Sequence, residues 1–103
     1  MQSKIALLTA LLFSGPALAQ EPSERGRVLL EEFCAGCHAL GKTGESPHVA
    51  APAFRKLNRS FDLDEFAVKL QSGLLAGHPD MPAFKFNEED ARAISAYLRS
   101  VQE

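Results

Sequence analysis

Two cysteines and a histidine in the order Cys34, Cys37, His38 limit this chain more than any other feature of its sequence. Residues three positions apart lie on one side of a helical turn, so both sulfur atoms can reach the same edge of a single flat ligand. This spacing, with histidine directly after the second cysteine, is typical of covalent haem attachment. The two thiols would form thioether bonds to the porphyrin, and the imidazole would bind the iron. The sequence therefore predicts one attached haem.

Two other kinds of site could use a cysteine pair at this spacing. A dithiol redox motif would be expected in a β-α-β setting, and the sequence has no convincing strand alternation. Half of a zinc site would need two further ligands at a regular spacing. His48 and His78 are available but form no second pair. We therefore favour haem attachment, with a thiol oxidoreductase as the least favoured alternative.

The first 19 residues have the pattern of a secretory signal peptide. Lys4 gives a positive start, residues 5–13 are apolar, and residues 17–19 (Ala-Leu-Ala) match a small-residue cleavage site. The alternative is an anchor that stays attached, but the apolar run is shorter than the roughly 20 residues that a bilayer requires. We predict cleavage after residue 19, a mature domain of residues 20–103, and export to the periplasm of a Gram-negative bacterium.

Composition narrows the possible partners and limits the stability of the chain. The 103 residues fit one domain, and the net charge of −2, with acids and bases both well represented, gives no indication of a nucleic-acid partner. A chain this small has difficulty stabilising itself through its own apolar core. A bound haem would add a large apolar surface. Two cysteines in an oxidising compartment would tend to pair with each other, and haem attachment consumes both.

Apolar spacing and capping residues predict an all-α fold. We expect a helix from Pro22 to about Cys34, a short helical turn at 54–58, a helix that opens at Asp62 and stops near Gly73, and a last helix capped by Asn87. Residues 39–53 and 74–86 have the composition of irregular loops. The expected apolar faces are Val28, Leu29 and Phe33 in the first helix, Leu63, Phe66 and Leu70 in the second, and Ala91, Ile94, Tyr97, Leu98 and Val101 in the last.

The second loop carries a methionine that could be an iron ligand. Met81 is the one methionine left after cleavage, and Pro79 and Pro82 bracket it. Methionine more often fills gaps in a core, but this one is not on an apolar helix face. A thioether is a weak ligand, so a loop stiffened by prolines would lose less entropy in holding it. His78 is an alternative ligand from the same loop, and His48 is more typical of a surface histidine.

On these features the sequence resembles the class I cytochromes c, of the small bacterial type with a single haem. The resemblance extends over residues 22–101 and depends on the cysteine–histidine motif, on Met81-Pro82 and on the closing helix. It implies that the N- and C-terminal helices cross, with shorter helices and loops wrapped around one haem c. Its residues would be Cys34 and Cys37 for the thioether bonds, with His38 and Met81 as the two axial ligands of the iron.

The same resemblance assigns roles to further residues. Gly26 matches the glycine at which the two terminal helices cross, and Tyr97 matches an aromatic position of the last helix. Pro52 resembles the proline whose carbonyl accepts a hydrogen bond from the proximal histidine. The sequence departs from the family pattern at two places. Leu30 stands four residues before the first cysteine, where an aromatic residue is usual, and residues 51–54 (Ala-Pro-Ala-Phe) replace the usual Gly-Pro-x-Leu.

The implied ligand set determines the expected function. With both axial positions filled, no coordination site is open for oxygen, peroxide or substrate, so the iron can only change its oxidation state. We expect a soluble periplasmic electron carrier, not an enzyme, that meets a redox donor and acceptor transiently and has no stable membrane insertion after cleavage. The alternatives are a cytochrome subunit of a dehydrogenase or oxidase complex, and a haem enzyme or gas sensor if Met81 does not bind.

Four basic residues could steer an acidic partner or form a solvated mixed surface. They are Lys42, Arg55, Lys56 and Arg59.

Overall fold

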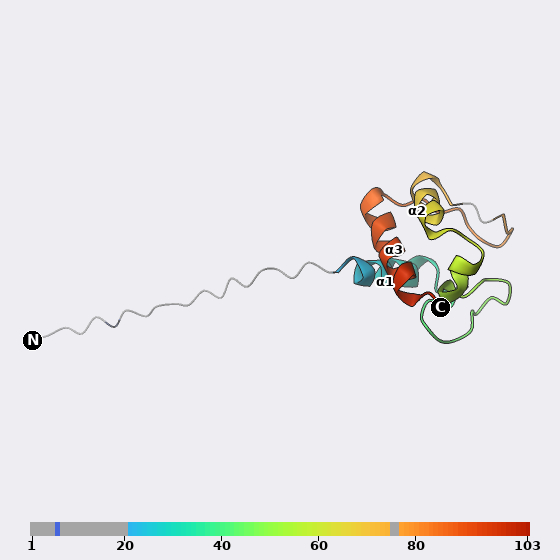
Figure 1. Ribbon diagram of the computed structural model, residues 1–103, viewed down its shortest axis with the longest axis horizontal. Helices are drawn as coiled ribbons and strands as arrows, with labels where there is room; N and C mark the ends of the chain where they lie inside the picture. Colours follow the sequence, from blue (N-terminus) through green and yellow to red (C-terminus); the bar gives the residue numbers. More distant parts are fainter. Residues whose placement is uncertain (1–5, 7–20, 75–76) are drawn as a thin grey trace, which may run out of the picture.

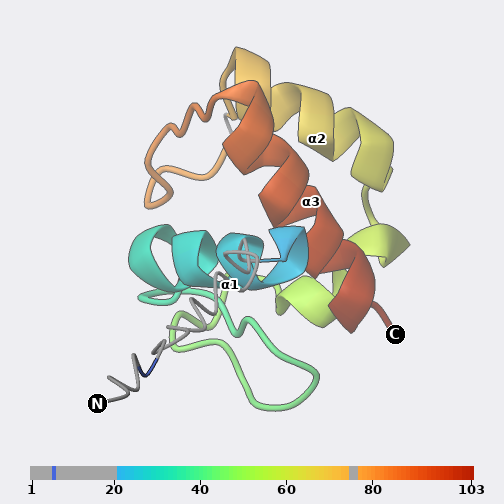
Figure 2. The ribbon, with the colours of Figure 1, turned by 90° about the vertical axis from the view of Figure 1, so that its left-hand side faces the viewer.

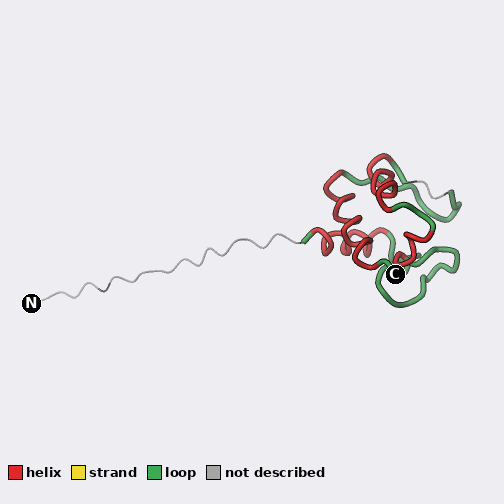
Figure 3. The backbone as a smooth tube through the Cα atoms, viewed as in Figure 1, coloured by secondary structure: helices red, strands yellow, loops and turns green. Residues whose placement is uncertain are grey.

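Three α-helices and one 3-10 helix are the regular elements of the computed structural model (Figure 1), which describes residues 21–74 and 77–103 together with residue 6. They are α1 (Pro22–Phe33), the 3-10 helix η1 (Phe54–Arg59), α2 (Leu63–Ser72) and α3 (Glu88–Val101). The long segments between them are loops (Figure 3), and the β pairing among the described residues is one isolated bridge between Leu74 and Phe84. The all-α prediction is confirmed. The predicted signal peptide lies, apart from residue 6, outside the described residues.

No helix in the described part of the chain combines the length and the apolar character that a membrane crossing requires.

The crossing of α1 and α3 brings their backbones into direct contact at Gly26 (Figure 2). A Cβ atom built at Gly26 would overlap the carbonyl oxygen of Ala93, and it would lie 2.5 Å from that carbonyl carbon and 3.0 Å from Cα of Ile94. Glycine within a helix costs about 1 kcal/mol relative to alanine. Here the absence of a side chain allows the close approach of the two helices, which is the crossing that the family resemblance implies for this residue.

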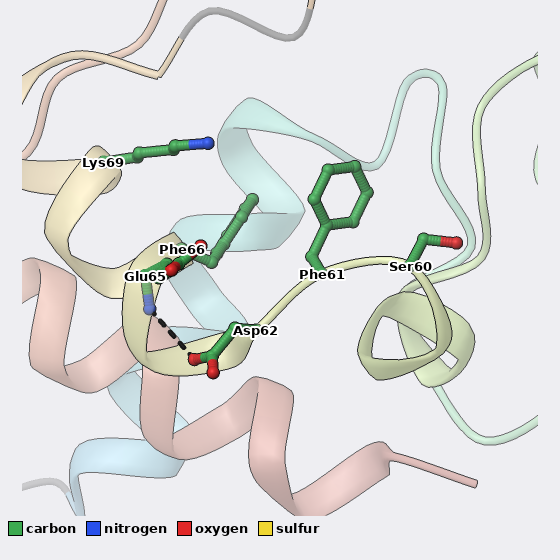
Figure 4. A pocket seen from close by; sticks show the side chains of 6 residues that line it. All are labelled: Ser60, Phe61, Asp62, Glu65, Phe66 and Lys69. Atoms are coloured by element: carbon green, nitrogen blue, oxygen red, sulfur yellow. Dashed lines mark hydrogen bonds between the residues drawn. The ribbon is translucent and has the colours of Figure 1, made fainter.

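Side-chain caps set the start of α2 and α3. The carboxylate of Asp62 accepts hydrogen bonds from the N–H groups of Asp64 and Glu65 in the first turn of α2, at 2.8 and 3.2 Å. Figure 4 shows the second of these bonds. The side-chain oxygen of Asn87 accepts one from the N–H of Asp90 at 2.8 Å. These contacts satisfy donors that have no partner inside the helix. Gly73 follows α2 with a φ of 123°, a conformation that favours glycine. Both caps and the stop agree with the predictions from sequence.

One apolar cluster joins all four helical elements. Its members from the predicted faces include Leu29, Leu70, Ile94 and Leu98, each with 5% exposure or less. The prediction for Phe33 was wrong, because its side chain is 44% exposed, whereas Leu30 is 3% exposed. Phe33 is the last residue of α1, and its ring contacts Phe84 and Phe86 edge-on, at centroid distances of 6.3 and 5.5 Å. The buried cluster consists of Leu29, Leu30, Phe54, Leu57, Leu70, Leu74, Ala91, Ile94 and Leu98.

Candidate functional site

A turn directly after α1 carries the two cysteines and the histidine. The N–H groups of Cys37 and His38 both donate to the carbonyl oxygen of Cys34, at 3.2 and 3.0 Å. The chain therefore forms a hydrogen-bonded turn directly after Phe33. Cys34 is half-buried against the apolar cluster, whereas Cys37 is exposed, and both thiols are free. The sequence-predicted attachment residues thus lie on a defined turn at the edge of the core.

The environment of Cys34 is unlike that of a reactive dithiol. Burial raises the pKa of the Cys34 thiol to about 11, and the neighbouring Cys37 adds to the increase. Redox-active cysteines need a thiolate, which forms where cations or a helix N-terminus lower the pKa. Cys34 instead follows the C-terminal end of α1. Among the residues that the structure describes, no group of three or more His, Cys, Asp or Glu side chains is arranged to hold a metal ion. These observations weigh against both the dithiol and the zinc alternatives.

The imidazole of His38 is held from two sides. Its Nδ1 lies 2.7 Å from the carbonyl oxygen of Pro52, and its ring stacks on Phe54 with a centroid distance of 4.6 Å and an angle of 28° between the planes. A carbonyl oxygen can only accept a hydrogen bond, so Nδ1 carries the proton of the neutral ring, which leaves the lone pair on Nε2 for a metal. The contact that the resemblance implies for Pro52 is therefore present, although the residues around it differ from the family pattern.

Contacts from the end of α3 hold the segment that supports His38. The N–H of Phe54 donates to the carbonyl oxygen of Ala39 at 2.9 Å, and the carbonyl oxygen of Phe54 accepts from Nε2 of Gln102 at 2.7 Å. Oε1 of Gln102 accepts from the N–H of Asn58 at 2.9 Å. Neither Phe54 nor Gln102 was predicted from the sequence as part of the site. The position of Phe54, two residues after Pro52, was an available signal, but a lone glutamine on a distant helix end gave none.

The loop between α2 and α3 carries Met81 and is closed at its base. The N–H of Leu74 donates to the carbonyl of Phe84 at 2.7 Å, and the N–H of Phe84 donates back at 3.3 Å. Met81 is partly buried and packs against the same apolar cluster as Cys34. The N–H of Met81 donates to the carbonyl oxygen of His78 at 3.1 Å. The structure thus places the sulfur-bearing side chains of Met81 and Cys34 against one cluster.

Tyr97 ties α3 to the loop that follows His38. Its hydroxyl donates to the carbonyl oxygen of Leu40 at 2.9 Å, and its ring packs against the apolar cluster. Burial raises the pKa of the Tyr97 hydroxyl, and the nearby Arg27 partly opposes this effect. The hydroxyl is therefore a stable donor at neutral pH. This contact restrains the chain two residues beyond the candidate iron ligand.

The basic residues predicted near the site are only partly free to meet a partner. Arg55 and Arg59 both form ion pairs with Glu103, at 3.3 and 2.9 Å, and the Arg55 side chain is only 13% exposed. Lys42 and Lys56 form no ion pair within the part of the chain that the structure describes. A docking role for the basic residues therefore depends on the two lysines.

A hollow at the start of α2 lies apart from the cysteine turn along the chain. Its volume of about 90 Å³ would hold a few water molecules, so it is not a complete cofactor pocket. Figure 4 shows the side chains of Phe61 and Phe66 among those that line it. The lining residues are Ser60, Phe61, Asp62, Glu65, Phe66 and Lys69.

The arranged residues fit a large flat group that is apolar and carries a metal. They supply two free thiols, an imidazole whose neutral form has its lone pair on Nε2, and a thioether against the same cluster as one of the thiols. The large apolar side chain of Phe33, directly before Cys34, is also uncovered, with 44% exposure. A chain of this size would gain stability by burying such surface against a bound group.

Comparison with known proteins agrees with the interpretation of these residues as a haem site. Residues 23–102 match the model of a protein family described as Cytochrome c. The chain is also similar to a protein named cytochrome c oxidase subunit 2, from Alkalihalophilus pseudofirmus, with 34% identity over 106 residues. That alignment covers 84% of this chain and 29% of the relative, so the chain spans less than a third of the relative's length.

Proposed function

Since this chain belongs to the cytochrome c family, whose members bind haem c covalently and transfer electrons, we propose that it is a soluble electron carrier of the periplasm. The observation that carries the proposal is which ring nitrogen of His38 donates a hydrogen bond. Its Nδ1 donates to Pro52 at 2.7 Å, which leaves Nε2 as a ligand for iron. Met81 packs against the same apolar cluster as Cys34 and is the proposed second ligand.

Each proposed residue has one task toward the haem. Cys34 and Cys37 would hold it by thioether bonds, and His38 and Met81 would bind its iron. When bound, the haem supplies one-electron exchange between iron(III) and iron(II). The Pro52 carbonyl keeps the proton of His38 on Nδ1, and the stacked ring of Phe54 restrains rotation of the imidazole. Because no residue has to donate or accept a proton, the chain acts by fixing the ligands.

A carrier with this ligand set has no position at which a substrate could bind the iron. We infer that it is not an enzyme and that electrons pass during brief encounters with a redox donor and a redox acceptor. Such encounters use small interfaces. Lys42 and Lys56, which have no ion-pair partner among the described residues, would favour an acidic partner surface and increase the rate of association at low salt.

The oxidase-related protein supports a second candidate function. The stretch of that protein that matches this chain is a minor part of its length, so a cytochrome segment of this kind can be joined to a larger protein. The alternative is therefore a cytochrome c subunit of a membrane or periplasmic oxidase or dehydrogenase complex. The native molecular mass after mild extraction separates the two: a carrier migrates as a free monomer, whereas a subunit migrates with an assembly.

Carbon monoxide tests whether the iron has an open coordination position. We expect the visible spectrum of the reduced protein to stay unchanged under carbon monoxide, because His38 and Met81 would together leave no open position on the iron. The Met81→Ala variant is the matched control, and we expect it to bind the gas. Binding of carbon monoxide by the unaltered protein would contradict the carrier and favour a haem enzyme or gas sensor.

A further inference from the structure

Two loops lie next to the candidate iron ligands in the chain, and a side-chain contact joins the two loops. One loop follows His38, and the other carries Met81. Nε2 of His48 in the first loop lies 3.3 Å from a carboxylate oxygen of Asp80 in the second. The rings of His48 and His78 also meet edge-on, with a centroid distance of 5.7 Å. The contact spans 32 positions of sequence, so it is a tertiary contact between the loops.

His48 is anchored to the cysteine turn on its own side. Its backbone N–H donates to the carbonyl oxygen of Cys37 at 3.1 Å. Its Nδ1 accepts from the N–H of Ala50 at 3.1 Å, so the proton of the neutral ring is on Nε2 and points to Asp80. This proton placement leaves no lone pair on Nε2 for a metal ion. The histidine is therefore a hydrogen-bond donor that is fixed to the haem-attachment turn.

Asp80 is in turn tied to the backbone that carries Met81. Its N–H donates to Nδ1 of His78 at 3.3 Å, and the N–H of the next residue, Met81, donates to the carbonyl oxygen of His78 at 3.1 Å. The turn from His78 to Met81 is thus closed on itself. A restraint on the carboxylate of Asp80 consequently limits where the backbone of Met81 can move.

We propose that His48 is a positioning residue for Met81 and that the His48–Asp80 contact is a clasp between the two loops. The inference rests on the proposed ligation of iron by Met81. A thioether binds iron weakly, so the fraction of molecules with the bond formed depends on how much freedom the loop loses when it forms. The clasp removes part of that freedom beforehand and favours the bound arrangement.

The clasp should have only a small effect on the closing of the loops, because both of its side chains are partly exposed to water. The side chains of His48 and Asp80 are 33% and 66% exposed, and pairs of this kind have small energies in water. We therefore expect the clasp to strengthen the closed arrangement about two- to fivefold. An effect of that size is too small to prevent folding but large enough to measure by competition.

Added imidazole is a suitable probe because it competes with Met81 for the oxidised haem iron. We expect His48→Ala and Asp80→Ala each to increase the apparent affinity for imidazole about two- to fivefold. The double variant should show no further increase, because the two residues act through one contact. His48→Gln, which can place an N–H near the position of Nε2, should restore most of the original affinity. Val49→Ala is the matched control, since Val49 is fully exposed beside His48.

A second readout does not depend on the iron's affinity for a competitor. We expect His48→Ala to increase hydrogen exchange of the Met81 backbone N–H by a similar factor, because the loop opens more often. An unchanged imidazole affinity in both single variants would overturn the clasp, as would effects that simply add in the double variant.

Met81→Ala separates a failure of this inference from a failure of the proposed ligation. If Met81 is a ligand, its removal must increase the affinity for imidazole far more than the loss of the clasp does. If Met81→Ala leaves that affinity unchanged, the ligand assignment is wrong and the clasp has no ligand to position. If Met81→Ala increases it while His48→Ala does not, only the clasp is wrong.

Discussion

Met81→Ala is expected to lower the reduction potential of the haem by on the order of 100 mV or more. Axial ligands set haem potentials over a span of about 0.8 V, and a thioether sulfur favours iron(II) over iron(III). Loss of the sulfur removes this preference and exposes the iron to water or to another ligand. Potentiometric titration, followed by the visible spectrum, measures the shift directly.

Two further variants separate ligation from packing at this position. Met81→Leu keeps most of the side-chain volume against the apolar cluster but removes the sulfur, so it should lower the potential about as much as alanine does. His78→Ala tests the other candidate ligand of the loop and should leave the potential near its original value. A normal potential in Met81→Leu together with a large fall in His78→Ala would identify His78 as the ligand instead.

Gly26→Ala is expected to destabilise the fold by about 2–3 kcal/mol, which is the upper range for an added group in a packed core. The added Cβ would overlap the Ala93 carbonyl oxygen and lie 3.0 Å from Cα of Ile94, and both are backbone groups that cannot rotate away. The two helices must therefore separate. Without this contact, alanine would stabilise the helix by about 1 kcal/mol relative to glycine. A net loss of stability would therefore show that the two helices are in close contact at Gly26. Denaturant unfolding of the haem-loaded protein measures it.

Gly41→Ala is the control for this substitution. A Cβ at Gly41 would meet no atom within 4 Å, so we expect a change within about 0.5 kcal/mol. If Gly26→Ala were as stable as the original protein, or more so, α1 and α3 could not be in the close contact described above.

Signals that lie within a few residues of each other were sufficient to predict much of this fold. The caps at Asp62 and Asn87 and the stop at Gly73 act locally, so the pattern alone located α2 and α3. Which side of α1 is buried depends on where α3 crosses it. The sequence favoured Phe33 for the core, whereas Leu30 is buried and Phe33 contacts the loop beyond α2. Ala93, which meets Gly26 at the crossing, has no distinctive sequence signal.

In the candidate site, too, some residues could be predicted from the sequence and others could not. The residues that would bind the haem stand in short motifs, so their chemistry could be predicted. The residues that support them meet only in the folded chain. Phe54 stacks on His38 across 16 positions, and Gln102 reaches the Phe54 carbonyl across 48. The sequence left open whether Arg55 meets a partner or belongs to a mixed surface, and in the structure it pairs with Glu103. Such contacts depend on the path of the loops, which composition does not determine.

The intact mass of the protein, measured after denaturation, shows whether haem is bonded covalently to Cys34 and Cys37. The full sequence would be produced in a bacterium that has haem-attachment machinery, beside a Cys34→Ser/Cys37→Ser variant. We expect the unaltered polypeptide to retain the added mass of one haem through denaturation and the double variant to carry none. A polypeptide without that added mass, from cells that attach haem to another c-type cytochrome, would contradict the predicted attachment.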